Sequence, residues 1–284
     1  MSASPGPRHA RIPTRRRILE SVLNVAYAGD WPARVWHRMA GTADVSVARH
    51  RIARPWSTAR PGRMAFISDL HIGPTTPVPL LERAFDTIRR AEPDVLLLGG
   101  DYVFLEATPA RLEVLGRLVS SVSCIAKLAV LGNHDLWTDA GAIVRTLESA
   151  GATVLVNQAV ALPEPWHDVV VVGLDDPWTG QCDAPAAFAG TNGEPVRVVL
   201  CHGPDGLRPA SAFAFDLYLC GHTHGGHLAT PWGPVFMPEG TLCRQYPGGF
   251  ARVNGADVYV SRGIGGVEVP FRTFAPPDVL LIDL

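Results

Sequence analysis

The chain has 284 residues, of which 47% are hydrophobic and 18% are charged, and its formal net charge is −2. This composition is typical of a globular protein and excludes a disordered chain or a bundle of membrane-spanning helices. No run approaches the ~18 consecutive apolar residues of a spanning helix. The five cysteines show no C-x-x-C spacing, which predicts free thiols and a reducing, cytoplasmic compartment.

Charge is distributed unevenly along the chain. Residues 1–63 carry 12 arginines and 3 acidic residues, a net charge of +9, whereas the remainder has a net charge of −11. The acidic body argues against a nucleic-acid partner. The basic first segment favours peripheral contact with an anionic membrane, here the inner membrane, and a solvated tail is the alternative.

We predict that residues 1–60 form a basic segment distinct from a globular domain over residues 61–284. The stretch SASPGPRHARIPTRRR is rich in Pro and Arg, and we expect it to be mobile. Ile18, Val22 and Val25 then recur at helical spacing. They predict an amphipathic helix that lies in a membrane interface or, alternatively, packs on the surface of the domain.

From Met64 onward, short apolar runs alternate with stretches of helical pattern. Helices are predicted over residues 79–91, 109–122 and 139–150, and strands at MAFIS, DVLLLGG, CIAKLAVLG, DVVVVGL, VRVVLC, DLYLC and DVLLIDL. Near-continuous Val and Leu runs indicate strands buried on both faces. The pattern predicts a layered α/β domain with a strand-rich C-terminal half.

Polar residues follow five of these predicted strands. They are Asp69 and His71; Asp101, after two glycines; Asn133, His134 and Asp135; His202; and His222 with His224. Each ending alone could be a turn or a helix cap. Because open α/β sheets bind ligands beyond the carboxyl ends of their strands, we expect all five endings at the same edge of one sheet.

The donor set, leaving His134 aside, contains two carboxylates, one amide and four imidazoles. These are too many for one metal ion and about right for two. Mixed nitrogen and oxygen ligation favours Mn, Fe or Zn over Mg or Ca, and we predict two divalent ions, with Mn preferred. Asp101 is the natural shared ligand because a carboxylate has two oxygens. Two such ions suit in-line displacement at phosphorus.

The series DLH…GGD…GNHD…H…GHTH resembles the calcineurin-like metallophosphoesterase superfamily over residues 64–230. The resemblance implies a four-layer αββα sandwich with a dinuclear metal site at the strand ends, and a catalytic domain over residues 61–284. It places Asp69, His71 and His224 on one metal, Asn133, His202 and His222 on the other, and Asp101 between them. It also implies that His134 protonates the leaving oxygen or steadies the phosphate, and that Asp135 orients the His134 imidazole.

The segments GGDYV, GLDDPW, GHTHGG, VSRGIGG and PFRTFAPPDVLLIDL are similar to a bacterial subgroup of small phosphodiesterases. That subgroup includes the UDP-2,3-diacylglucosamine pyrophosphatases of lipid A synthesis. The likeness implies hydrolysis of a phosphodiester or pyrophosphate bond in a lipid-linked nucleotide sugar such as UDP-2,3-diacylglucosamine. Candidate substrate contacts are Arg262 and Arg272, whose guanidinium groups match phosphate, and His227, which replaces the subgroup's usual Gln.

Two other functions are compatible with these patterns. A soluble cyclic-nucleotide or general phosphodiesterase should remain active without detergent after deletion of residues 1–45. A non-catalytic binding module on the same fold is the other alternative, but all seven predicted ligands and His134 are present. The complete ligand set favours an enzyme.

Overall fold

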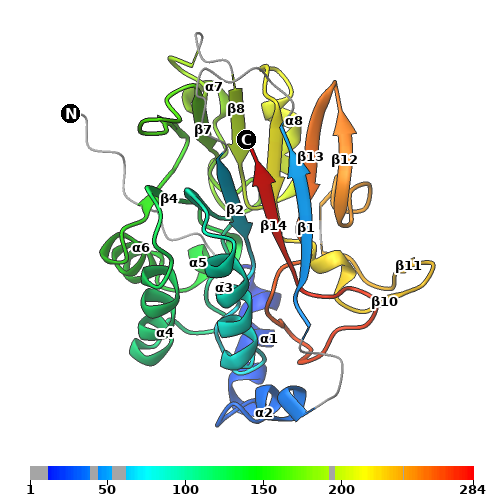
Figure 1. Ribbon diagram of the computed structural model, residues 1–284. Coiled ribbons are helices and arrows are strands. Elements are labelled where there is room, and N and C mark those ends of the chain that lie inside the picture. Colours follow the sequence, from blue (N-terminus) through cyan, green and yellow to red (C-terminus); the bar gives the residue numbers. More distant parts are fainter. Residues whose placement is uncertain (1–11, 39–43, 53–61, 192–195, 239) are drawn as a thin grey trace.

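The computed structural model describes residues 12–38, 44–52, 62–191, 196–238 and 240–284. Two six-stranded sheets form the centre of the molecule, and helices cover their outer faces (Figure 1). Every strand and helix predicted above from residue 64 onward is present. The predicted α/β class and layered architecture are confirmed.

The first sheet combines the N-terminal half of the domain with the last strand of the chain. Its order is β1 (Ser46–Arg51), β14 (Asp278–Asp283), β2 (Arg63–Ile67), β3 (Val95–Leu98), β4 (Ala126–Ala129) and β5 (Thr153–Val154). β2, β3 and β4 are mutually parallel, whereas β14 is antiparallel to β2. β1, which the sequence did not predict, lies before residue 60 but pairs with β14 of the first sheet. The domain division at residue 60 stays a prediction.

The second sheet is built from the C-terminal half. Its order is β12 (Gly249–Val253), β13 (Ala256–Val260), β9 (Leu217–Cys220), β8 (Val196–Leu200), β7 (Val169–Gly173) and β6 (Gln158–Ala161). β7, β8, β9 and β13 run parallel. A separate hairpin, β10 (Ala229–Thr230) with β11 (Gly233–Pro234), projects from the body (Figure 1).

The strands are buried on both faces because each sheet lies between two apolar layers. In β3, Val95 and Leu97 belong to the core between the two sheets, whereas Leu96 and Leu98 face the helices. This alternation follows from the two-residue period of a strand. It explains why the strand sequences are continuously apolar rather than alternating.

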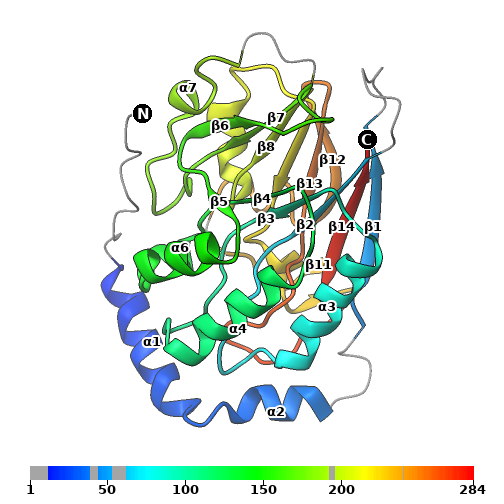
Figure 2. The same cartoon turned by 60° about the vertical axis from the view of Figure 1, so that its left-hand side comes forward.

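The helical layers are unequal. α3 (Val78–Arg90), α4 (Pro109–Ser120) and α6 (Ala140–Ser149) cover the first sheet (Figure 2), and α5 (Asn133–Trp137) contacts α6. The second sheet is covered by two single turns, α7 (Ala184–Ala187) and α8 (Leu207–Ala210), and by loops. The αββα sandwich therefore has one thick and one thin outer layer.

The N-terminal segment contributes two helices at one end of the molecule. α1 (Thr14–Ala26) and α2 (Trp31–Arg38) lie at the lower end of Figure 1. The last four residues of the stretch expected to be mobile, Thr14–Arg17, begin α1; residues 1–11 lie outside the described part. Leu23 packs on the body, whereas Ile18, Val22 and Val25 are exposed.

None of the helices within the described residues combines the length and the apolar character needed to cross a membrane. The five cysteines, all described, are free thiols, as predicted.

We predict that the core between the sheets dominates stability. Leu97→Ala should lower the free energy of unfolding by about 2–5 kcal/mol, because it removes a buried side chain and leaves a cavity. Ile125→Ala, at an exposed position (47%), should change it by less than about 0.5 kcal/mol. Chemical denaturation measures both values, and equal effects would contradict the assigned core.

Candidate dinuclear metal centre

The predicted metal ligands converge at the carboxyl ends of strands from both sheets. Asp69 and Asp101 follow β2 and β3 of the first sheet, whereas His202 and His222 follow β8 and β9 of the second. The expectation of a single sheet edge is therefore wrong. The packing of the two sheets brings two parallel strand ends together, and the site lies where they meet.

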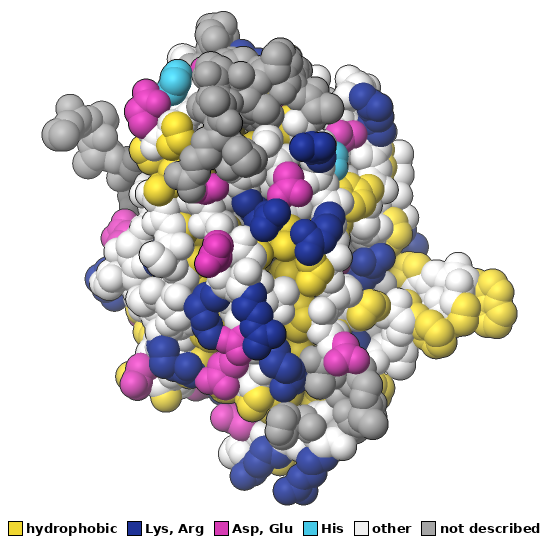
Figure 3. Space-filling view, viewed as in Figure 1, with side chains coloured by type: hydrophobic (Ala, Val, Ile, Leu, Met, Phe, Trp, Pro, Cys, Tyr) yellow, Lys and Arg dark blue, Asp and Glu magenta, His cyan; other side chains and the backbone are white. Residues whose placement is uncertain are grey.

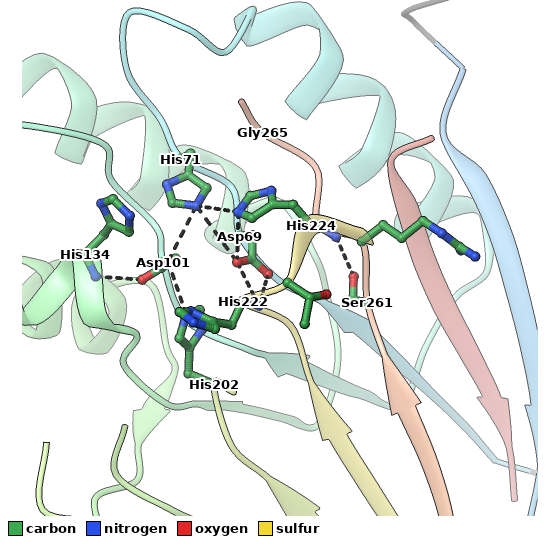
Figure 4. A network of polar contacts seen from close by, with 12 residues as sticks. Asp69, His71, Asp101, His134, His202, His222, His224, Ser261 and Gly265 are labelled. Carbon is green, nitrogen blue, oxygen red and sulfur yellow. Dashed lines mark hydrogen bonds and ion pairs between the residues drawn. The ribbon is translucent and has the colours of Figure 1, made fainter. Parts of the chain in front are cut away.

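One group of ligands consists of Asp69, His71 and His224 (Figure 4). The His224 Nε2 atom lies 3.4 Å from Asp69 Oδ1 and 3.1 Å from His71 Nε2. All three side chains are buried. Two imidazole nitrogens and a carboxylate oxygen that face one another at this distance suit a transition metal ion.

The second group consists of Asp101, His202 and His222. His202 Nε2 lies 3.1 Å from Asp101 Oδ2 and 3.3 Å from His222 Nδ1. The same Asp101 oxygen lies 3.5 Å from His71 Nε2 in the first group. Asp101 therefore faces both groups, the position that a bridging ligand requires.

Asn133 supplies a further oxygen donor at the start of α5. Its side-chain Oδ1 is buried and has no hydrogen-bond partner among the described residues, and Asn133 lines the same cavity as Asp101 and His222. Buried polar atoms are rarely left without a partner. A cation held by this nitrogen and oxygen donor set would satisfy it, so the residues present fit a metal centre.

Backbone groups hold the ligand side chains in place. The Gly99 carbonyl accepts a hydrogen bond from His202 Nδ1 at 2.9 Å, which leaves Nε2 directed at Asp101. The backbone N–H of His134 donates to Asp101 Oδ1 at 2.8 Å, which leaves Oδ2 for the two ligand groups. Such contacts behind the ligands fix their orientation and tune a metal site.

The turns that carry the ligands adopt unusual backbone conformations. Five of the seven predicted ligands have φ between 42° and 70°, a region that costs residues other than glycine about 1–3 kcal/mol when strained. At Gly100, φ is +92°, and a Cβ atom there would lie 2.6 Å from the backbone nitrogen of Gly132. The glycine permits the close approach of these two turns.

Electrostatics also favour a cation. Burial raises the pKa of Asp69 to about 7, and the charge of Asp101 adds to this shift although His202 opposes it. Burial alone would raise the pKa of Asp101 too, but the neighbouring histidines hold it well below its usual range. Two buried carboxylates near one another are expensive without positive charge between them.

His134 and Asp135 do not form the predicted pair. The Asp135 carboxylate accepts hydrogen bonds from the backbone N–H groups of Gly132, Asp101 and Tyr102 at 2.8–2.9 Å. His134 Nδ1 has no partner among the described residues. The prediction that Asp135 orients the imidazole is therefore wrong, because both carboxylate oxygens already bind the strand-end backbone.

The three predicted substrate contacts lie in different environments. Arg272 is buried and donates to the carbonyls of Arg262 and Gly265, with its Nη2 atom 2.9 Å from His224 Nδ1. Arg262 pairs with Asp278. Neither arginine is among the described residues that line the cavity over the metal site, whereas His227 is. The direct substrate role predicted for the two arginines is therefore not supported by the geometry.

A cavity of about 700 Å³ opens over the ligands. Its floor includes Asp101, His134 and His222, and its walls include the apolar side chains Leu19, Trp137, Trp178, Leu228, Phe236 and Val269. Arg15 and Arg16 of α1 also line it. The sequence analysis did not predict that Arg16 lines the cavity, because nothing distinguishes it from the neighbouring arginines. It could have found Trp178, which belongs to the GLDDPW segment.

The fold and site define a class of protein. Residues 62–226 match the calcineurin-like phosphoesterase family, and these residues include all seven predicted ligands. The chain belongs to this family of metallophosphoesterases and is a hydrolase.

Relatives with and without a named activity share most of the chain. The chain is 35% identical to the phosphodiesterase YaeI of Escherichia coli, over 83% of this chain and 87% of that protein. It is 27% identical to the uncharacterized metallophosphoesterase YkuE of Bacillus subtilis, over 76% and 77%. It is 24% identical to the UDP-2,3-diacylglucosamine pyrophosphatase LpxG of Chlamydia muridarum, over 78% and 82%.

We predict that Gly132→Ala disrupts metal binding. A Cβ atom at Gly132 would lie 2.2 Å from Asp101 Oδ1, so the shared carboxylate must move. Bound metal, measured by inductively coupled plasma mass spectrometry after Mn²⁺ loading, should fall at least about tenfold, the loss typical of disturbed supporting contacts.

Gly116→Ala is the matched control. Its new methyl group would meet only Thr146 Cγ2, at 3.4 Å, on α4 and far from the ligands in sequence. The control should retain full metal content, and full occupancy in Gly132→Ala would contradict the placement of Asp101.

Proposed function

We propose that the protein is a dinuclear metal-dependent phosphodiester or pyrophosphate hydrolase that acts on a lipid-linked nucleotide sugar of the UDP-2,3-diacylglucosamine type. The observation that carries this proposal is the cavity over the predicted ligands, with its polar floor and apolar walls. Phosphate would lie on the floor, and acyl chains would lie against side chains such as Leu19, Trp178 and Phe236. The similarity to the pyrophosphatase LpxG supports the substrate class.

The chemistry follows from the donor set. Asp69, His71 and His224 would hold one divalent ion and Asn133, His202 and His222 the other, with Asp101 shared; Mn is our first choice, and Fe and Zn suit the same ligands. The bound ions would polarise the phosphoryl group and stabilise the attacking and leaving oxygens. His134 lines the cavity and lies close enough to His71 and Asp101 to form a third candidate group with them; we assign it to the leaving oxygen and not to a metal ion.

His227 would contact the substrate beyond the phosphate. Its Nε2 atom lies 2.8 Å from the carbonyl oxygen of Val269, and its buried Nδ1 atom has no partner among the described residues. The hydrogen bond from Nε2 to the carbonyl holds the imidazole in place in the lining of the cavity. Its ring would contact the acylated sugar.

We also propose that the protein works in the cytoplasm, at the surface of the inner membrane. Ile18, Val22 and Val25 of α1 are 58–81% exposed, and Trp232 and Phe236, at and after the β10–β11 hairpin, are 92% and 72% exposed. Figure 3 shows hydrophobic side chains gathered on the projecting hairpin. Exposed apolar residues near a basic segment favour an anionic lipid surface.

Vesicle binding tests the membrane proposal. Val22→Glu should reduce sedimentation with phosphatidylglycerol vesicles several-fold, because it places a charge in the exposed apolar stripe. Ile125→Glu, a similar change at an exposed position of the body, should leave it unchanged. Equal binding of both variants, or equal binding of the wild type to phosphatidylcholine and phosphatidylglycerol, would contradict the proposal.

Hydrolysis of UDP-2,3-diacylglucosamine by metal-stripped protein, with and without Mn²⁺, tests the substrate. We expect Mn²⁺-dependent release of UMP. Asp101→Ala should abolish turnover, because it removes the shared ligand of both ions. Bis-p-nitrophenyl phosphate serves as a generic diester in parallel.

The outcomes separate the candidate functions. Activity on the generic diester alone would reject the lipid substrate and favour the general phosphodiesterase. The absence of metal-dependent hydrolysis of either compound would favour the binding module. Deletion of residues 1–45 no longer distinguishes these cases, because α1 lines the cavity.

A further inference from the structure

An arginine of the N-terminal helix reaches the predicted catalytic histidine. Arg16 Nη2 lies 3.4 Å from His134 Nε2, although 118 residues separate the two in sequence. Both residues line the cavity over the metal ligands. α1 therefore forms part of the wall of the site, not only a surface appendage.

The guanidinium group of Arg16 is held on one side by acidic and aromatic partners. Its Nε donates to Glu20 at 2.9 Å, its Nη1 donates to Glu268, and its Cζ lies 5.2 Å from the centre of the Trp137 ring. The remaining nitrogen, Nη2, faces His134. An arginine fixed in this way loses little rotamer freedom when it binds an anion.

The contact between Arg16 and His134 is a long one that depends on the tautomer of the imidazole. A separation of 3.4 Å is longer than an ordinary N–H hydrogen bond, and Nη2 carries only donors. In the Nδ1–H tautomer, His134 Nε2 accepts from Arg16 Nη2; in the Nε2–H tautomer, which His134 needs in order to donate to a leaving oxygen, two donors face each other. An anionic oxygen between them would accept from both.

We propose that Arg16 binds the substrate phosphoryl group, and that its Nη2 and His134 Nε2 together donate to one phosphoryl or leaving-group oxygen. This inference rests on the proposed phosphoesterase function. A role for Arg16 as an anchor of α1 needs only the contacts with Glu20 and Glu268, which leave Nη2 beside His134 in the lining of the cavity. The predicted basic segment would then supply a substrate-binding residue to the active site.

Kinetics of the Mn²⁺-loaded full-length enzyme on bis-p-nitrophenyl phosphate test the proposal. Arg16→Ala should lower kcat/KM about 100-fold, the effect of losing a donor to developing charge, with unchanged metal content. Added guanidinium should restore part of the rate, a readout that a structural role would not give. Arg16→Lys should rescue little, because an ammonium group cannot replace the planar fork.

Two variants control for charge and for helix docking. Arg17→Ala removes the same charge one residue away. Arg17 lies with the exposed residues of α1 and does not line the cavity over the metal ligands, so the kcat/KM of this variant should stay within about twofold of the wild type. Leu23→Ala weakens the packing of α1 on Phe104 and Leu105 without removing the guanidinium group. If Leu23→Ala matched the loss in Arg16→Ala and guanidinium rescued neither, the role would be structural and the proposal wrong.

Binding of inorganic phosphate separates this inference from the proposed function. Isothermal titration of the Mn²⁺-loaded protein requires no turnover, and Arg16→Ala should raise the Kd for phosphate about tenfold relative to Arg17→Ala. Equal Kd values would overturn the inference even if the enzyme hydrolyses its lipid substrate. A raised Kd would sustain it even if the lipid substrate proves wrong.

Discussion

The buried carboxylate of Asp101 is the constraint on which the site depends. One of its oxygens is bound by the backbone of His134, and the other faces His71 in one ligand group and His202 in the other. A buried charge of this kind is stable only where it is paired or bound to a cation. The neighbouring turns, including the close approach at Gly132, are shaped to hold it.

This arrangement requires the two sheets to be packed in one defined position. Asp101 follows β3 of the first sheet and His202 follows β8 of the second, so a small sliding of the sheets would separate them. Close-packed cores resist such sliding. The apolar layer between the sheets therefore supports the geometry of the site as well as stability, and it offsets the left-handed backbone conformations of the ligand turns.

α1 has two chemically different faces that meet different surroundings. Arg16 and Leu23 contact the body, whereas Ile18, Val22 and Val25 remain exposed. A helix that contacts the candidate site through one face and a lipid surface through its exposed apolar face would couple substrate binding to lipid binding. Under the proposed function, one short element then contributes to both phosphate recognition and access for an acylated substrate.

Local sequence patterns predicted the central strands, the helices that cover the first sheet and the candidate ligands. Continuous apolar runs such as DVLLLGG predict buried strands because burial on both faces removes polar alternation, and Asp and His after Gly-bounded strand ends predict ligands. The pairing of β1 with β14, the convergence of two sheets, the backbone contacts of Asp135 and the approach of Arg16 to His134 emerged only from the tertiary structure. These contacts join residues far apart in the chain, and nothing in the periodicity of either segment specifies its distant partner.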